Sequence, residues 1–378
     1  MSPPVELPRW IDLIVLPAFN LALALLASGI VMLIVGHDPL QVVGLLVKGA
    51  FGSRLAVSYV LYYATTFVFT GLAVAVAYHA GLFNIGGEGQ AVLGGIGTAL
   101  VALALGDDLP AYIVLPAMML VAVACGVLWA ALPAALQAYR GSHVVITTIM
   151  FNFIGYALLS WLLVNVLRPP GTMTVESRSF GIGARLPGAH EALALVGIDW
   201  PRSPLNLSLL LAALAVVGVY WLLWRTRTGY AIRAVGHSPE AARYAGIDPP
   251  AQTMVAMAVA GGLAGLVGIN EVAGVHGRLL LDYVAGAGFA GIAVALIGRS
   301  HPVGIVLASL LFGALYQGGA ELAFEIPGFS REMVFTLQGL IVLFSGAMAQ
   351  VAAPMFGRAW RSWQHRGGAD AARERAHG

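Results

Sequence analysis

The run AYIVLPAMMLVAVACGVLWAALPAA, residues Ala111 to Ala135, contains no charged side chain. An α-helix of about 20 such residues crosses the hydrocarbon core of a bilayer, so this run predicts a membrane-spanning helix. Hydrophobic residues fill 59% of the 378 positions, charged residues fill only 10%, and the mean hydropathy is +0.84. A soluble domain of this length carries more charge, and a membrane β-barrel would show alternating rather than continuous apolar runs. The composition therefore predicts an all-α, polytopic membrane protein.

Ten runs of this kind can be counted along the chain, and each predicts a membrane helix. They lie near residues 11–35, 56–78, 85–105, 110–135, 143–166, 205–224, 251–271, 284–299, 302–320 and 332–352. The first run is too long for a signal-peptide core and has little positive charge before it, so we count it as a membrane helix. With ten spans, 12 of the 20 basic residues fall on the side of the N-terminus. Because cytoplasmic loops are enriched in Arg and Lys, both termini are expected in the cytoplasm.

The predicted membrane domain covers residues 1–356, and a polar, basic cytoplasmic tail covers residues 357–378. The net charge of +2 is spread over loops and tail, so nucleic acid is not an expected partner. Cys125 is the only cysteine, which excludes disulfide and paired-cysteine metal chemistry within this chain. Lys48 is the only lysine and does not belong to a G-x-x-x-x-G-K-[ST] phosphate loop. We therefore expect no catalytic residue, no metal site and no bound cofactor, and any ATP must bind another polypeptide.

The segment RTRTGYAIRAVGHSPEAARYAGIDPP, residues 225–250, is basic and carries helix start and stop signals. Ser238 is a good N-cap, Pro239 suits the first helical position, and Gly246 fits the residue just after a helix end. These signals predict a helix of about seven residues. A helix this short is marginal in water and must dock to persist. It can pack on the membrane helices of this chain or on a separate cytoplasmic protein, and we favour the second interpretation.

A long loop at residues 168–204 is predicted on the external side of the membrane. It has mixed charge, with four arginines against Glu176, Glu191 and Asp199. The simplest interpretation is a solvated connection between two spans. Its length also fits a lip that receives an external partner.

The stretch YHAGLFNIGGEGQ, residues 78–90, is the most unusual sequence near a predicted span. If the third span reaches about 20 residues, it begins near Ile85, with Asn84 as N-cap and Glu88 in the first turn, where the helix dipole favours a negative charge. An ionisable residue at this depth is a functional candidate, unless it lies at the inner boundary in contact with water. The glycines allow a broken helix at a solute path. A weak internal repeat relates the segment from Ala80 to AGAGFAGIAVALIG from Ala285.

Polar residues also follow one face of the fifth predicted span, where Thr148, Asn152, Tyr156 and Ser160 recur at a spacing of four. A polar stripe in a membrane helix faces other helices or a water-filled path. Tyrosines and threonines on the second span allow the same two interpretations, and its tyrosines also fit an interfacial belt. The candidate path residues are Tyr62, Thr66, Phe83, Asn84, Glu88, Gln90, Thr148, Asn152, Tyr156, Tyr316 and Gln317. Most bear hydroxyls or amides, so we expect an uncharged polar solute rather than an ion or an acid.

Three ordered stretches resemble one family of transport proteins: GLFNIGGEGQ at residues 81–90, SHVVITTIMFNFI at 142–154 and TGYAIRAVGHSPEAARYAGI at 228–247. They resemble the permease subunits of bacterial ATP-binding-cassette importers in the branched-chain amino acid, ribose and nucleoside group. The longer of the two nucleoside-importer permeases is the most similar. His143 and Phe151 depart from the pattern expected there, an acidic residue and a leucine, which weakens an assignment of the exact solute.

The resemblance implies an importer-permease fold in a bacterial inner membrane. It also implies a sister permease, two cytoplasmic ATPases that bind ATP and Mg²⁺, and an extracytoplasmic solute-binding protein. The third stretch resembles the ATPase-contacting loop of the family. The residues of that loop expected to couple transport to ATP hydrolysis are Gly229, Arg233, Gly236, Pro239, Glu240, Ala241, Ala242, Arg243 and Gly246.

We therefore expect an importer permease for nucleosides, with ribose-like sugars as the second solute class. An ion-coupled secondary transporter that uses Glu88 as its carrier is the rival from another class, and it would act without ATP. A membrane enzyme is a distant third, because no catalytic motif is visible in the sequence.

Overall fold

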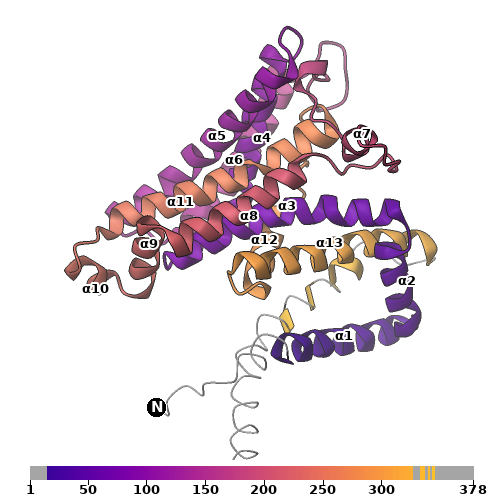
Figure 1. The fold of residues 1–378 in the computed structure, drawn as a ribbon, viewed down its shortest axis with the longest axis horizontal. Helices are drawn as coiled ribbons and strands as arrows, with labels where there is room; N and C mark the ends of the chain where they lie inside the picture. Colours follow the sequence, from indigo (N-terminus) through magenta and orange to yellow (C-terminus); the bar gives the residue numbers. More distant parts are fainter. Residues whose placement is uncertain (1–14, 327–332, 337–338, 341–342, 345–378) are drawn as a thin grey trace, which may run out of the picture. The chain divides into compact units, whose positions relative to one another are not determined.

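The computed structural model describes residues 15–326, 333–336, 339–340 and 343–344 (Figure 1). Its regular elements within these ranges are helices, and the only extended pairings there are two isolated bridges, Glu176 with Leu280 and Gly188 with Asn206. The expected all-α fold class is confirmed. The predicted basic tail lies outside the described residues, as does most of the tenth predicted span.

The helices follow the predicted apolar runs closely in the middle of the chain. The α-helices are α1 (Leu16–Val35), α2 (Pro39–Phe51), α3 (Arg54–His79), α4 (Gly87–Leu105), α5 (Ala111–Arg140), α6 (Val144–Leu162), α7 (Ala189–Ala194), α8 (Ser208–Arg225), α9 (Arg227–His237), α10 (Pro239–Tyr244), α11 (Pro249–Gly265), α12 (Ala287–Ile297) and α13 (Pro302–Glu325). Two π-helical segments, Leu163–Leu167 and Ile269–His276, extend α6 and α11, and a short 3-10 turn covers Ile182–Ala184.

Seven helices of the described residues are long and apolar enough to cross a membrane. The count is eight if α1 and α2, which are bent by 116° relative to one another, form one broken span. The predicted total of ten is not confirmed. The eighth predicted span, residues 284–299, is shorter than expected: α12 has 11 residues and covers about 16 Å at a rise of 1.5 Å per residue. A bilayer core is about 30 Å thick, so α12 crosses only part of it.

The chain forms two compact units, residues 1–45 with 320–378, and residues 46–319. In the first unit, α1 ends at Gly36, which adopts a left-handed conformation with φ +91°. The second unit contains the candidate site, so the rest of the description concerns residues 46–319.

Glycines hold α4, α5 and α11 together at short distance in this second unit, and Figure 1 shows α5 running beside α11. A Cβ atom on Gly126 would lie 2.1 Å from the carbonyl oxygen of Gly261, and one on Gly94 would lie 2.3 Å from the Cα atom of Gly265. Backbones approach this closely only where side chains are absent, which is the usual packing of small residues between membrane helices. The contact fixes the position of α11 and of the segment that follows it.

The helical hydrogen-bond pattern changes directly after α11. Gly268 packs against Gly95 of α4, where a Cβ atom would lie 2.5 Å from the Gly95 Cα atom. The chain then continues as the π-helical segment Ile269–His276 and ends at Gly277, whose φ is +60°. π-helical turns are rare and often occur at functional sites. In this protein the turn carries Asn270 and Glu271, which are both buried.

The N-termini of α4 and α12 meet within the second unit. A Cβ atom on Gly288 would lie 2.2 Å from the Glu88 nitrogen and 2.7 Å from the Gly87 carbonyl carbon. The two segments of the weak internal repeat therefore lie side by side at their glycines. Because an α-helix has a partial positive charge at its N-terminus, two such charges converge at this point.

Two sets of short helices lie at opposite ends of the second unit (Figure 1). α9 and α10 form one end, and α7 lies at the other. The predicted docking segment and the predicted external loop are therefore on opposite sides of the helix bundle, as the span prediction requires.

Candidate functional site

Glu88 lies at the point where α4, α6 and α12 meet, and its side chain is only 1% exposed. Its Oε1 atom accepts hydrogen bonds from the Tyr156 hydroxyl at 2.5 Å and from the Gly286 amide at 2.9 Å. Its Oε2 atom accepts one from the Gly288 amide at 2.7 Å. We call these four residues the Glu88 clasp. The burial argues against the alternative interpretation that Glu88 sits at the boundary in contact with water.

The backbone before α12 is shaped to receive this carboxylate. Ala285 and Gly286 are both left-handed, with φ of +49° and +79°. In this turn the Gly286 and Gly288 amides both point toward the carboxylate, and N–H groups gathered by a turn create an anion-binding concavity. The donors of the clasp are all uncharged, and among the described residues no ion pair to Glu88 is formed. The clasp thus stabilises the carboxylate with oriented dipoles.

Removing the tyrosine hydroxyl in Tyr156→Phe is expected to destabilise the protein by about 1.5–3 kcal/mol, the usual range for a hydrogen bond to a charged group. The purified protein in detergent should show a lower midpoint of thermal unfolding. Tyr112→Phe is the matched control, because Tyr112 is 78% exposed, and it should unfold at the wild-type temperature. Equal midpoints for Tyr156→Phe and the control would contradict this account of the clasp.

Two amides at the start of α4 donate to polar side chains. The helix begins at Gly87 with Gly86 as N-cap, so the predicted cap at Asn84 is wrong by two residues. Asn84 instead accepts a hydrogen bond from the Gly86 amide at 2.9 Å, and its side chain pairs with that of Gln90. Asn152 of α6 caps the helix, because its Oδ1 atom accepts from the Gly89 amide at 2.8 Å. The side-chain geometry explains why a glycine can stand at the cap position.

The predicted polar stripe of α6 faces this helix start. Thr148 and Asn152 are 0% and 2% exposed, and Asn152 also donates to the Ile85 carbonyl at 3.0 Å. Thr148 donates within its own helix to the Val144 carbonyl at 2.7 Å. The first of the two interpretations therefore applies: the stripe makes hydrogen bonds to another helix. These bonds hold the start of α4 against α6.

A second buried carboxylate, Glu271, was missing from the sequence-based set. It accepts hydrogen bonds from the hydroxyls of Tyr62 and Thr66, the latter at 2.5 Å. Asn270 donates to the Thr66 hydroxyl at 2.7 Å and is itself held by Asn206 and Ser208 at the start of α8. We call Tyr62, Thr66, Asn270 and Glu271 the Glu271 cluster.

The predicted set of path residues, most of which bear hydroxyls or amides, is therefore incomplete, because it lacks this second acidic group. The signal for Glu271 was present in the sequence, because an acidic residue closes the apolar run 251–271, and the rule that singled out Glu88 applies to it equally. The two acidic groups are linked through α3: Thr66 bonds Glu271, while Thr70, one turn later, packs against Gly291 of α12.

Aromatic rings extend the Glu271 cluster. Tyr63 lies with its ring centroid 4.9 Å from that of Tyr62 and 5.6 Å from that of Tyr316. Phe67 lies 5.0 Å from Tyr316. The structure thus brings Tyr316 to the predicted residues of α3. Gln317 is half-buried on α13.

Phe83 is not part of this group and lines a cavity together with Arg233 and Gly236.

The predicted docking segment contains two helices rather than one. α10 begins at Pro239, with the Ser238 hydroxyl accepting from the Ala241 amide at 3.2 Å, and Gly246 has φ +79° as its predicted role after the helix end requires. α9 was not predicted as a separate helix, because its start at Arg227 follows the apolar α8 almost without a break. The preceding residue, Thr226, caps it by accepting from the Gly229 amide at 3.0 Å.

The two faces of this helix pair differ. Ile232, Val235 and Ala242 are buried, so the pair does pack on its own membrane helices. Gly229 and Gly236 permit this close approach, since a Cβ atom on either would lie 2.0–2.2 Å from a carbonyl oxygen of α8 or α3. The opposite face of α10 is exposed, and it carries Pro239, Glu240, Ala241, Arg243 and Tyr244. Among the described residues nothing covers that face, so a second protein can contact it.

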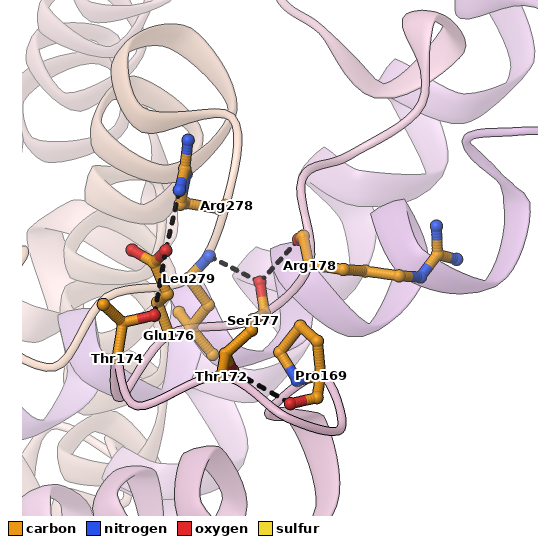
Figure 2. Close-up of polar contacts among 8 residues, drawn as sticks. All are labelled: Pro169, Thr172, Thr174, Glu176, Ser177, Arg178, Arg278 and Leu279. Carbon is orange, nitrogen blue, oxygen red and sulfur yellow. Dashed lines mark hydrogen bonds and ion pairs between the residues drawn. The ribbon is translucent and has the colours of Figure 1, made fainter.

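The loop at residues 168–204, which the sequence predicts to be external, is fixed to the ends of membrane helices. Figure 2 shows Ser177 beside Leu279, where the Leu279 amide donates to the Ser177 hydroxyl at 2.9 Å, and Glu176 paired with Arg278 at 2.8 Å. The Arg178 side chain points away from this group and pairs with Asp107, after α4, at 2.7 Å. The loop is therefore a folded cover over the ends of α4 and of the π-helical segment, rather than a loose connection.

The chain matches the family model described as branched-chain amino acid transport system / permease component over residues 56–348. It is 34% identical to a guanosine ABC transporter permease protein of Bacillus subtilis, over 88% of this chain and 92% of that protein. It is 33% identical to a glucose ABC transporter permease protein of Haloferax volcanii, over 91% of this chain and 90% of that protein. A nucleoside ABC transporter permease protein of Lactococcus lactis is 31% identical, with 88% and 90% of the two chains covered.

Proposed function

Because the chain belongs to the family of branched-chain amino acid transport system permease components, we propose that it forms half of the membrane path of an ATP-binding-cassette importer for nucleosides. Membership makes the chain a multi-pass membrane protein and a transport component. We further propose a bacterial inner-membrane location with cytoplasmic termini, a sister permease and an extracytoplasmic solute-binding protein. A cytoplasmic ATPase binds ATP and Mg²⁺ in this proposal, and this chain binds no cofactor.

The observation that carries the solute assignment is the aromatic group beside the Glu271 cluster. A nucleoside has a flat base and a ribose with hydroxyl donors. The half-buried rings of Tyr63 and Tyr316 offer faces for the base, since offset or tilted ring pairs are favourable, and the buried Phe67 packs against Tyr316. The Glu271 carboxylate and the hydroxyls of Tyr62 and Thr66, which bond to one another in this structure, are acceptors and donors of the kind that sugar hydroxyls need, and they would exchange partners when the path opens. Identity to relatives does not decide the solute, because the glucose relative is as similar as the guanosine relative.

The contacts of α9 support a route from the proposed ATPase to the path. A single residue, Ser238, separates α9 from α10. Gly236 of α9 touches the end of α3 and the turn after it, because a Cβ atom on Gly236 would lie 2.2 Å from the His79 carbonyl oxygen and 2.9 Å from the Gly81 nitrogen. That turn leads directly into α4 and Glu88. A displacement of α10 by the ATPase would therefore shift the start of α4 and strain the hydrogen bonds of the Glu88 clasp. We propose this as the coupling between ATP hydrolysis and the alternation of the path between outward-open and inward-open states.

Competition of uptake tests the proposed solute. Cells that express this chain with its partner genes should take up labelled guanosine, and excess unlabelled nucleosides should reduce that uptake more than tenfold. Excess glucose or ribose should leave it unchanged. Inhibition by glucose or ribose with no effect of nucleosides would instead establish the sugar alternative that the Haloferax relative favours. Transport by this chain alone in liposomes without ATP, abolished by a protonophore, would overturn the importer in favour of the Glu88 carrier.

A further inference from the structure

A cavity of about 530 Å³ lies between the turn after α3 and helix α9. Its volume falls within the range of about 300–1,000 Å³ that is usual for small-molecule sites. Part of its wall is the backbone contact of Gly236 with His79 and Gly81, where a Cβ atom on Gly236 would lie 2.2 and 2.9 Å from their backbone atoms. That wall is rigid, because neither side can be moved without displacing backbone.

The charge in the cavity comes from Arg233. Arginine carries a positive charge, and its planar guanidinium suits the recognition of phosphate groups. Its Nε atom is buried and has no hydrogen-bond partner among the described residues. Among the described residues that line the cavity, none carries a carboxylate. A buried N–H group without a partner is costly, so the position favours an acceptor, and an anionic acceptor compensates the charge as well.

The remaining walls are aromatic. Tyr78, Phe83 and Trp224 line the cavity, and the first two are 51% and 37% exposed. Trp224 is held in place by Tyr220, stacked at 5.5 Å, and by the edge of His79 at 5.3 Å. Guanidinium and aromatic groups together suit a ligand with a phosphate group next to a flat or apolar portion. His237 adds its ring nitrogens to the same wall, where the Nε2 atom of His79 is already bonded to the Ser300 carbonyl at 3.0 Å.

We propose that this cavity binds a phosphate ester through Arg233 and the surrounding aromatic rings. Soluble nucleotides and phospholipid headgroups both carry this group. The site is separate from the exposed face of α10 and from the Glu88 clasp, since no residue of either lines it. The cytoplasmic position of this site rests on the proposed function, whereas the binding of a phosphate ester does not depend on that function. A bound ligand would bridge α9 and the turn after α3, and would thereby regulate the motion that couples the ATPase to the path.

Binding is measured on the full-length chain without ATPase subunits, so that nucleotide sites on a partner do not contribute. In maltoside detergent micelles, which contain no phosphate group, titration with AMP and with inorganic phosphate is followed by calorimetry. In a second arm, native mass spectrometry counts phosphatidylglycerol retained from mixed nanodiscs. We expect saturable binding in at least one arm, weakened at least tenfold in Arg233→Gln. Arg227→Gln, which removes the same charge from an exposed position of α9, should bind as the wild type does.

The arms separate the sources of the phosphate group. Binding of AMP or inorganic phosphate identifies a soluble ligand, and retention of phosphatidylglycerol alone identifies a lipid. Phe83→Leu is the second variant, and it should weaken AMP or lipid binding severalfold while leaving inorganic phosphate unaffected. Ligand binding that is equal in wild type and Arg233→Gln would overturn the site. If that variant also loses its ATPase partner in pull-down, Arg233 contacts protein instead, and the proposed transport function stands without the phosphate site.

Discussion

Reversing one exposed charge on α10, in Arg243→Glu, is expected to lower solute uptake at least tenfold without destabilising the protein. Arg243 lies in the last turn of a six-residue helix whose opposite side is anchored by the buried Ala242. The side chain makes no ion pair among the described residues. Its loss therefore removes no ion pair among those residues, while a new carboxylate repels any acidic surface that receives the arginine. Mismatched charges at an interface typically cost several kcal/mol of association free energy.

Uptake, pull-down of the ATPase and thermal unfolding are measured on the same variant. Uptake and the recovered ATPase should fall together, while the unfolding midpoint stays at the wild-type value. Arg227→Glu is the matched control on α9, because it is exposed but belongs neither to α10 nor to the coupling set. It should transport normally. Normal uptake in Arg243→Glu would count against the assignment of α10 as the docking helix.

Adding one methyl group at the junction of α4 and α12, in Gly288→Ala, is expected to abolish uptake and to destabilise the protein by about 3 kcal/mol, the upper end of the usual cost of overpacking. The new Cβ atom would stand 2.2 Å from the Glu88 nitrogen and 2.5 Å from its Cα atom. Both neighbours are backbone atoms, so the two helices must separate. Separation also breaks the hydrogen bond from the Gly288 amide to the Glu88 carboxylate.

The control for this substitution is Gly218→Ala in α8. Gly218 is also a membrane-helix glycine, but outside its chain neighbours and the backbone of its own helix no atom lies within 4 Å of its hypothetical Cβ atom. It should fold and transport as the wild type does, and Gly288→Ala should show a lower midpoint of thermal unfolding. If the two variants behave alike, the close contact between α4 and α12 does not exist in the working protein.

Much of the helix pattern is predictable, because bilayer thickness demands about 20 apolar residues for each crossing. α3, α4 and α5 begin within two residues of their predicted starts. α12 was predicted too long, since the residues before it are apolar but adopt left-handed conformations at Ala285 and Gly286 that no periodicity reveals. The helix break at residues 269–276 was also invisible, because a π-helical turn changes hydrogen bonding without changing composition.

The residue types of the candidate site were predictable from the sequence, but the hydrogen bonds between these residues were not. Glu88 and Tyr156 were both singled out, yet nothing in the sequence pairs them. The remaining donors of the clasp are backbone amides, which carry no sequence signal of their own. Glu271 was passed over because it closes an apolar run instead of opening one. Ser238, Pro239 and Gly246 were predicted correctly, since capping depends on neighbours within a few residues.

The Glu88 clasp also sets an order for biosynthesis. Glu88 and the Gly288 amide are 200 residues apart in the chain, so a ribosome completes the carboxylate long before it makes these donors. During that interval an acidic side chain at membrane depth lacks most of its final hydrogen bonds, which is an unfavourable state. A truncated chain that ends before residue 286 never gains the two amide donors. A carboxylate in the bilayer that lacks these hydrogen bonds thus distinguishes incomplete copies from finished ones.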